Sequence, residues 1–107
     1  MPNQELEYRV LKHLEKNPNI TQRQLAVKLG VSLGKAHYLI SAMVKVGWVK
    51  LDNFKRSDNK LGYIYLLTPT GMVEKTKITR NFLAFKESEY LQLKHEIEQL
   101  KSEVRNF

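Results

Sequence analysis

Residues 20–47 read ITQRQLAVKLGVSLGKAHYLISAMVKVG and contain the start and stop signals of two consecutive helices. Thr21 and Gln24 have the spacing of a capping box, in which the hydroxyl and the amide each bind a free backbone N–H at a helix start. The hydrophobic residues that flank this cap have the spacing of a staple, and Gly30 is a typical residue at a helix end. The sequence therefore predicts a helix between Thr21 and Gly30.

A second helix is predicted after a turn of about three residues. Ser32 is suited to cap its start, and Gly47 follows its end. The buried face of this helix is expected to hold Ala36, Leu39, Ile40 and Met43, which recur at helical spacing. Its opposite face carries Gly34, Tyr38, Ser41 and Lys45, flanked by Lys35 and His37. Two helices joined by a short turn that contains glycine form a helix-turn-helix.

The residues on either side extend this motif into a larger fold. We expect a preceding helix over about residues 4–16, capped by Asn3 and ended by a proline after Asn17. After the motif, residues 48–51 and 63–67 are typical of strands, and a polar, basic loop over residues 52–60 connects them. A hairpin that directly follows a helix-turn-helix predicts a winged helix.

A long helix is predicted to complete the chain. Thr68 and Pro69 are suited to the cap and to the first helical position, and nothing after Met72 interrupts the pattern for some 35 residues. The predicted fold class is mainly α with a small β-hairpin: a winged helix-turn-helix plus a long C-terminal helix. We expect residues 1–70 to form a DNA-binding domain and residues 71–107 to form a dimerisation helix.

The C-terminal helix contains a heptad pattern that favours a coiled coil. Its expected dimerisation residues, at the a and d positions, are Leu83, Tyr90, Leu93, Ile97, Leu100 and Val104. Branched residues at a with leucine at d favour two parallel strands. In a parallel homodimer Glu89 and Glu96 of each chain would face Lys94 and Lys101 of the other. The alternative is a helix that packs back on its own domain.

The positive charge of the chain is concentrated in the helix-turn-helix and the hairpin. The chain has 18 lysines and arginines, 11 aspartates and glutamates, and a net charge of +7. Residues 20–65 hold eight of the basic and two of the acidic side chains, whereas residues 71–107 are nearly neutral. A basic surplus on one part of a small domain is typical of a nucleic-acid-binding protein.

We expect contacts with double-stranded DNA from three places. The outer face of the second motif helix would enter the major groove, the start of the first motif helix would hold a phosphate, and the hairpin loop would reach a flanking groove. The candidate DNA-binding residues are Thr21, Gln22, Arg23, Ser32, Gly34, Lys35, His37, Tyr38, Ser41, Lys45, Lys55, Arg56 and Lys60. Phe54 in the hairpin is either a minor-groove wedge or, more in keeping with its position, a packing residue.

Three stretches of the sequence resemble the MarR family of bacterial transcription regulators. They are Leu25-Ala-Val-Lys-Leu-Gly-Val-Ser32, Met43-Val-Lys-Val-Gly-Trp-Val49 and Tyr65-Leu-Leu-Thr-Pro-Thr-Gly71. The whole chain is similar to the short subgroup of this family that is associated with exopolysaccharide gene clusters. The resemblance implies a dimeric winged-helix regulator of transcription. The two-fold symmetry of such a dimer would require an inverted-repeat operator. Family wings commonly carry an arginine that enters the minor groove, where this chain has Lys60, and an effector pocket is not implied.

Other functions find little support in the sequence. His13, His37 and His95 are scattered, the chain has no cysteine, and no nucleophile or phosphate-binding motif is present, so we expect neither an enzyme nor a cofactor or metal. No secretory signal or membrane span is evident, and a cytoplasmic protein is expected. The main alternative is a winged helix that binds another protein and no DNA. RNA binding is a third reading, although an aromatic stacking platform is not evident.

Overall fold

The structure is a computed structural model that describes residues 2–55 and 61–106. Its elements follow one another as α1 (Pro2–Lys16), α2 (Gln22–Leu29), α3 (Leu33–Lys45), β1 (Val49–Lys55), β2 (Leu61–Leu67) and α4 (Pro69–Arg105). The two strands form an antiparallel hairpin in which Val49 pairs with Leu67 and Leu51 with Tyr65. The predicted winged helix-turn-helix with a long C-terminal helix is thus confirmed.

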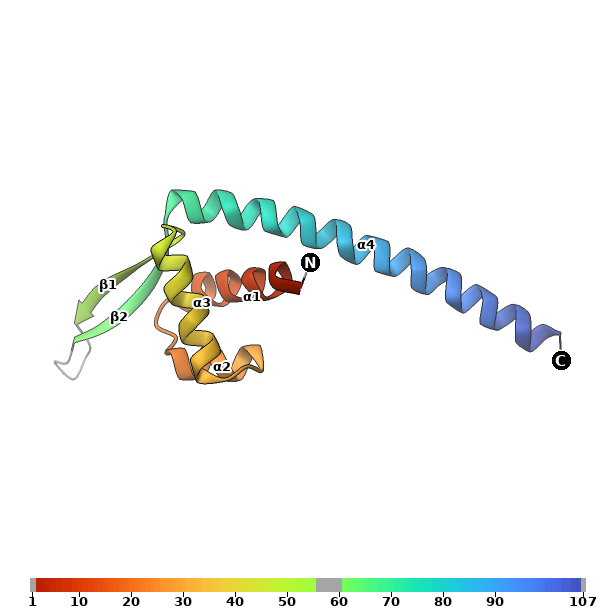
Figure 1. The fold of residues 1–107 in the computed structure, drawn as a ribbon, viewed down its shortest axis with the longest axis horizontal. Helices are drawn as coiled ribbons and strands as arrows, with labels where there is room; N and C mark the ends of the chain where they lie inside the picture. The colour runs from red at the N-terminus through yellow and green to blue at the C-terminus, as the bar shows by residue number, and fades with distance from the viewer. Residues whose placement is uncertain (1, 56–60, 107) are drawn as a thin grey trace.

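The molecule is elongated because its two ends project in opposite directions. Figure 1 shows α4 running across the domain above α1 and then continuing alone to the C-terminus, while the hairpin leaves the domain at the other end. The principal extents are 70 × 27 × 23 Å. The wing and the free part of α4 therefore lie at opposite ends of the long axis.

The helix boundaries follow from the capping signals in the sequence. The Thr21 hydroxyl accepts from the Gln24 backbone N–H, the Gln24 side chain accepts from the Thr21 backbone N–H, and Gly30 ends α2 with a φ of 70°. Ser32 caps α3 and Thr68 caps α4, each by accepting from a backbone N–H three residues later. These predicted caps are confirmed. The cap expected at Asn3 is wrong, because α1 already begins at Pro2, a residue suited to the first helical position.

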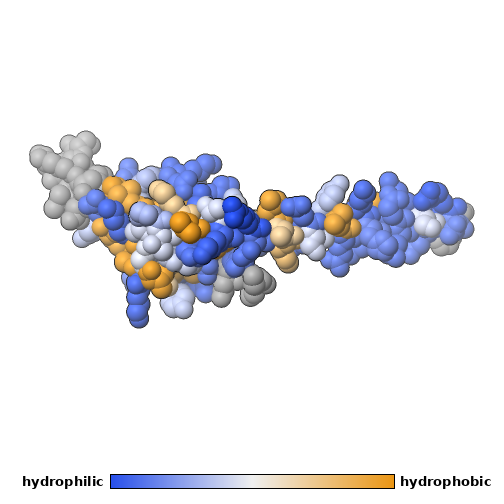
Figure 2. Space-filling model, turned by 90° about the horizontal axis from the view of Figure 1, so that it is seen from above, coloured by the Kyte–Doolittle hydropathy of each residue, from blue (hydrophilic) through white to orange (hydrophobic). Residues whose placement is uncertain are grey.

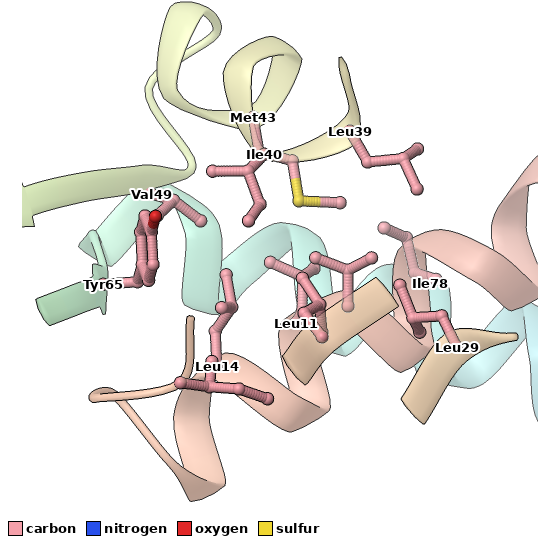
Figure 3. Close-up of a cluster of buried hydrophobic side chains, with 12 residues drawn as sticks. Leu11, Leu14, Leu29, Leu39, Ile40, Met43, Val49, Tyr65 and Ile78 are labelled. Carbon is pink, nitrogen blue, oxygen red and sulfur yellow. The ribbon is translucent and has the colours of Figure 1, made fainter. Parts of the chain in front are cut away.

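The core is made where all the helices and both strands of the domain meet. In Figure 3, buried side chains from α1, α2, α3, the hairpin and α4 point toward one another. The predicted inner face of α3 is confirmed, because its four residues are all buried. The contribution of α4 is Ile78, which is 4% exposed. The first turns of α4 therefore pack on the domain and complete its core.

The junction between the wing and α4 is tight. Only Thr68 separates β2 from α4, and its backbone N–H donates to the Trp48 carbonyl oxygen at 3.0 Å. Gly71 is buried against the same carbonyl, and a Cβ added to it would lie 1.9 Å from the Trp48 oxygen. Only glycine fits here, so the start of α4 is held directly against the end of the turn before β1.

The α4 helix leaves the domain after an aromatic contact with α1. The rings of Tyr8 and Phe82 are stacked with centroids 5.2 Å apart, and the Lys86 ammonium lies 5.3 Å from the Phe82 centroid. Closer to the wing, Lys75 forms an ion pair with Glu15 at 3.1 Å. We call residues 83–105, which follow this contact, the α4 tail. All of its side chains are exposed, so the tail does not pack back on the domain.

Candidate nucleic-acid interface

The outer face of α3 is the most prominent surface of the helix-turn-helix. Because α3 buries one stripe of apolar residues, the opposite stripe faces solvent. Gly34, Tyr38, Ser41 and Lys45 are all exposed, as are Lys35 and His37 beside them. Tyr38 is 64% exposed, an unusual position for a large aromatic side chain that no core contact explains. The structure brings these six candidate residues together on one helix face.

The N-terminal turn of α3 combines free space with positive charge. A Cβ at Gly34 would meet only the Ser32 Oγ, at 4.0 Å, so nothing inside the domain requires a glycine there. The Lys35 ammonium lies 5.4 Å from the Tyr38 ring centroid, a cation–π contact that holds the charge over the outer face. A helix N-terminus with an exposed lysine is an environment that favours phosphate.

The start of α2 is arranged differently from the expectation. Thr21 caps the helix, and Arg23 is exposed, so both lie where a phosphate contact was predicted. The Gln22 amide, however, is engaged inside the domain: its Nε2 donates to the Tyr65 hydroxyl at 3.4 Å, and its Oε1 lies 3.0 Å from His37 Nδ1. Gln22 is therefore a bridge between β2 and α3 rather than a free phosphate ligand.

The bridge continues onto the outer face of α3. Ser41 Oγ lies 3.5 Å from His37 Nε2, one helical turn further along. The polar chain thus runs from buried Tyr65, which is 7% exposed, through Gln22 and His37 to Ser41. Sequence reasoning placed Tyr65 only as a strand residue and missed this role. The available signal was the presence of two tyrosines, Tyr63 and Tyr65, in an otherwise apolar strand, since a buried tyrosine hydroxyl usually finds a partner.

The basic side chains of the motif are available to an external anion. Among the residues that the structure describes, the ion pairs lie on α4 or join α4 to α1. Within that same part of the chain, Arg23, Lys28, Lys35 and Lys45 form no ion pair. Because no carboxylate of the described residues pairs with them, their charge contributes to the positive potential of the α2–α3 surface.

The base of α2 is fixed to α1 by a second set of polar contacts. Arg9 donates to the carbonyl oxygens of Lys28, at 2.9 Å, and of Leu29, at 3.4 Å, and so satisfies the C-terminal end of α2. Nearby, burial and then the positive charge of Lys28, Arg9 and their lysine neighbours lower the pKa of His13 below its ordinary value. These surroundings thus favour the neutral form of the His13 ring over its charged form.

A cavity of about 290 Å³ lies beside the outer face of α3. Glu7 of α1 and Trp48 line it together with Lys35, Tyr38 and the C-terminal half of α3. Burial raises the pKa of the Glu7 carboxyl above its ordinary value. Lys35 and Tyr38 therefore border both the cavity and the exposed face of α3.

The wing is longer than predicted at its first strand. The predicted strand ended at Leu51, but β1 continues to Lys55, because Asp52 and Asn53 pair with Ile64 and Tyr63 of β2. The predicted loop over residues 52–60 is thus wrong for its first four residues. The side chains of Phe54 and Lys55 lie outside the described residues, as do Arg56 and Lys60 altogether, so the wing contacts stay predictions.

The expected dimerisation residues form a stripe on the α4 tail. Their exposed fractions range from 42% at Ile97 to 73% at Val104, and Figure 2 shows apolar side chains interspersed among the hydrophilic ones along the tail. The last turns carry a shallow apolar hollow lined by Ile97, Leu100, Val104 and two basic residues. Within the chain, Glu89 pairs with Lys86 and Glu98 with Lys101, so cross-chain pairs would replace these weak exposed contacts.

Across residues 2–55 and 61–106, no three histidine, aspartate or glutamate side chains are grouped in a way that would hold a metal ion. No helix in this part of the chain combines the length and apolar character needed to cross a membrane.

Comparisons with known proteins agree with the geometry of the domain. Residues 4–50 match the family model described as winged helix-turn-helix DNA-binding. A comparison of the sequence with curated proteins gave no significant match. The chain therefore carries a winged helix-turn-helix domain of the DNA-binding kind.

Solved structures with this fold include several MarR family regulators. S. aureus MarR in complex with salicylate and kanamycin has a TM-score of 0.57 at 12% identity, over 80% of this chain and 56% of that one. A MarR/EmrR family regulator from Acinetobacter sp. ADP1 has a TM-score of 0.59 at 17% identity, and the match covers 95% of this chain and 76% of that one. A mutant of S. aureus MepR has a TM-score of 0.62 at 17% identity, and the match covers 94% of this chain and 74% of that one. The fold is thus that of MarR family regulators, and this chain spans little more than half of the first of them.

Proposed function

We propose that this protein is a sequence-specific regulator of transcription that binds double-stranded DNA as a homodimer. The observation that carries the proposal is the outer face of α3, where Lys35, Tyr38, Ser41 and Lys45 are exposed together and the lysines have no carboxylate partner among the described residues. The match of residues 4–50 to a DNA-binding domain and the MarR-like fold support it. Two of the solved structures with this fold are MarR family transcription regulators, which makes regulation the role to test first.

In this proposal α3 enters the major groove. Lys35 and Tyr38 contact base edges or flanking phosphates, Thr21 and Arg23 hold the backbone at the start of α2, and the wing reaches an adjacent groove. Because the side chain at wing position 60 is lysine, we expect it to contact phosphates rather than to insert into a narrow minor groove, which arginine does better.

The second part of the proposal is a parallel homodimer through the α4 tail. An apolar stripe exposed to water over three heptads is stable when another copy covers it, and the parallel orientation brings Glu89 next to Lys94 and Glu96 next to Lys101. A two-fold dimer then requires an inverted-repeat operator with half-site centres about 10 bp apart, or a multiple of that spacing. Exopolysaccharide gene clusters are the first place to search for this operator, because of the sequence resemblance described above.

Direct binding measurements test the DNA part of the proposal. The full chain is titrated against labelled duplex DNA, single-stranded DNA and structured RNA at several salt concentrations. We expect the duplex to bind tightest, with log affinity falling linearly against log salt by about 0.9 per phosphate contacted. Lys35→Ala combined with Lys45→Ala should flatten this slope, whereas Lys77→Ala combined with Arg80→Ala, an equal loss of charge from exposed residues of α4, should not.

Two results would contradict this part of the proposal. Absence of duplex binding at low salt would favour the protein-interaction module. Preferential binding of RNA would favour the third reading of the sequence.

Sedimentation tests the dimer. Deletion of residues 88–107 removes most of the stripe but keeps the Tyr8–Phe82 stack, so the domain should remain folded and become monomeric. Its operator affinity should fall far more than its affinity for random DNA, because the stripe links two weak binding events into one. A truncated chain that is still dimeric would place the dimer interface elsewhere.

A further inference from the structure

The polar chain from Tyr65 to Ser41 fixes the state of a histidine on the outer face of α3. The side-chain amide of Gln22 contacts two groups through different atoms. Its Nε2 donates to the Tyr65 hydroxyl at 3.4 Å, and its Oε1 lies 3.0 Å from His37 Nδ1. An amide oxygen can only accept, so the hydrogen between Oε1 and Nδ1 must come from the histidine. The neutral ring of His37 therefore carries its proton on Nδ1.

The tautomer decides what the other ring nitrogen offers to a ligand. With Nδ1 protonated, Nε2 has a free lone pair, which in the unbound protein faces the Ser41 hydroxyl at 3.5 Å. Ser41 is exposed, so a donor from a ligand can take the place of its hydroxyl. In the major groove, the donors that complement such a lone pair are the exocyclic amino groups of adenine and cytosine, whereas guanine presents only acceptors.

Tyr65, at the buried end of this polar chain, is held in place by the core and by its backbone. Tyr65 is 7% exposed, its ring belongs to the core, and its backbone N–H donates to the Pro18 carbonyl oxygen at 3.0 Å. The hydroxyl that receives the Gln22 amide is thus fixed by β2 and by the turn between α1 and α2. The orientation of Gln22, and with it that of His37, is set by a residue at the root of the wing.

We propose that Tyr65 and Gln22 are positioning residues that hold His37 in its Nδ1–H tautomer, so that its Nε2 accepts a hydrogen bond from the amino group of adenine or cytosine in the operator. The proposal rests on the proposed function for its DNA part. The state of His37 in the unbound protein is independent of it, and this allows the two to be tested separately.

The first test uses the unbound full chain and nuclear magnetic resonance of ¹⁵N-labelled histidine. Spectra are recorded well above the ordinary histidine pKa of about 6.5, so that the ring is neutral, and His37 is assigned by its loss in His37→Asn. We expect the Nδ1–H pattern in the wild type and a change to Nε2–H, the form favoured by free imidazole in water, in Gln22→Leu. Gln22→Glu keeps an acceptor beside Nδ1 and should restore Nδ1–H. An Nε2–H ring in the wild type, or no change in Gln22→Leu, would overturn the proposal.

The second test measures base preference. Duplexes are selected from a random pool by the wild type and by each variant, and affinities for the wild-type selected duplex and for random DNA are compared. We expect Gln22→Leu to lower the selected-to-random ratio by roughly fivefold or more, the effect of one lost base contact, and to shift one position from adenine or cytosine toward guanine. The salt slope should stay the same, because no phosphate contact is removed.

A pair of tyrosine variants separates positioning from packing. Tyr65→Phe keeps the buried ring and removes only the hydroxyl, so it should lower the selected-to-random ratio in the same direction as Gln22→Leu. Tyr63→Phe, on the same strand and 61% exposed, is the matched control and should change nothing. Equal losses on selected and random DNA in Tyr65→Phe, or an unchanged ratio in both Tyr65→Phe and Gln22→Leu, would overturn the positioning role. Absence of any duplex binding by the wild type would contradict the proposed function while leaving the tautomer measurement valid.

Discussion

The winged-helix domain buries its regularly spaced apolar side chains, whereas the α4 tail exposes them. The domain buries a contiguous cluster that extends from Val10 to Ile78, and the polar group buried with it among the described residues is the Tyr65 hydroxyl, which binds Gln22. The tail has leucines, isoleucine and valine at regular spacing, yet all of them are exposed. Within a single chain, the apolar faces of the domain helices are covered by other elements, whereas the apolar face of the tail has no cover from the described residues.

The difference shows that an amphipathic pattern can be covered in two ways, by the same chain or by another molecule. Periodicity indicates that a face is to be buried, and it does not say whether the same chain provides the cover. Most helix stability in proteins comes from packing of such a face, so a projecting helix of this length gains from a second copy. The following predictions test how independent the two regions are.

The largest expected effect is the loss of a core side chain. Leu11 is fully buried, so Leu11→Ala should lower the free energy of unfolding of the domain by about 2–5 kcal/mol. Leu100→Ala removes the same atoms from the exposed tail and should leave it within about 0.5 kcal/mol. Denaturant titration followed by fluorescence of Trp48, the single tryptophan, reports the domain alone. Equal losses in both variants would mean that tail and domain unfold as one unit.

A smaller loss is expected where α4 is joined to the domain. Gly71→Ala would place a Cβ against the Trp48 carbonyl oxygen, which is backbone and can move only with the turn, so we expect a cost of about 1–3 kcal/mol. Gly34→Ala has open space in the first turn of α3 and should instead stabilise the domain by about 0.4–1 kcal/mol, because alanine restricts the unfolded chain. Thermal unfolding of the two variants should therefore shift in opposite directions, and a shared direction would refute the steric argument.

Charge changes on the tail should affect association and not the domain. Glu89→Lys with Glu96→Lys would place like charges across a parallel dimer and weaken it by up to about 1 kcal/mol per exposed pair. Adding Lys94→Glu and Lys101→Glu should restore the dimer, and the wild type and both variants should share one domain unfolding midpoint. Analytical ultracentrifugation at low salt provides the dissociation constants. An unchanged constant after the first swap would argue against the parallel arrangement.

The smallest expected effect is a pH dependence specific to the domain. The pKa of His13 is lowered in the folded chain, so the unfolded chain binds its proton first as the pH falls. The stability contributed by the neutral ring is present above the ordinary histidine pKa of about 6.5 and is lost as the pH falls toward the folded value. His13→Gln should flatten the slope of unfolding free energy against pH in this window. His95→Gln, on the exposed tail, should keep the wild-type slope.

The parts of the fold that the sequence predicted are those decided by local chemistry. The capping box at Thr21 and Gln24, the cap at Ser32 and the Thr68–Pro69 helix start each depend on residues within one helical turn. The extension of β1 was missed because Asp52 and Asn53 have low strand propensity, and pairing with β2 overrides it.

In the candidate site, too, the features set by local sequence were predictable and the long-range contact was not. The outer face of α3 follows from helical periodicity alone, and the structure places all six of its candidate residues there. The contact between Gln22 and Tyr65 joins residues 43 positions apart, and no spacing in one sequence indicates it. Sequence reasoning therefore found the residues on the surface and missed the buried group that orients one of them.

The tight junction at Gly71 also gives α4 a mechanical property. A helix of 37 residues is about 55 Å long, and it starts one residue after the wing strand with its first turn held against the Trp48 carbonyl. No flexible linker lies between β2 and α4, and the first turns of α4 also pack on α1, so α4 is rigidly joined to the whole domain. A tilt of the domain by about 5° displaces the far end of the helix by about 5 Å, simply from its length. In the proposed dimer, a small reorientation of one domain would become a larger movement where the two α4 tails touch.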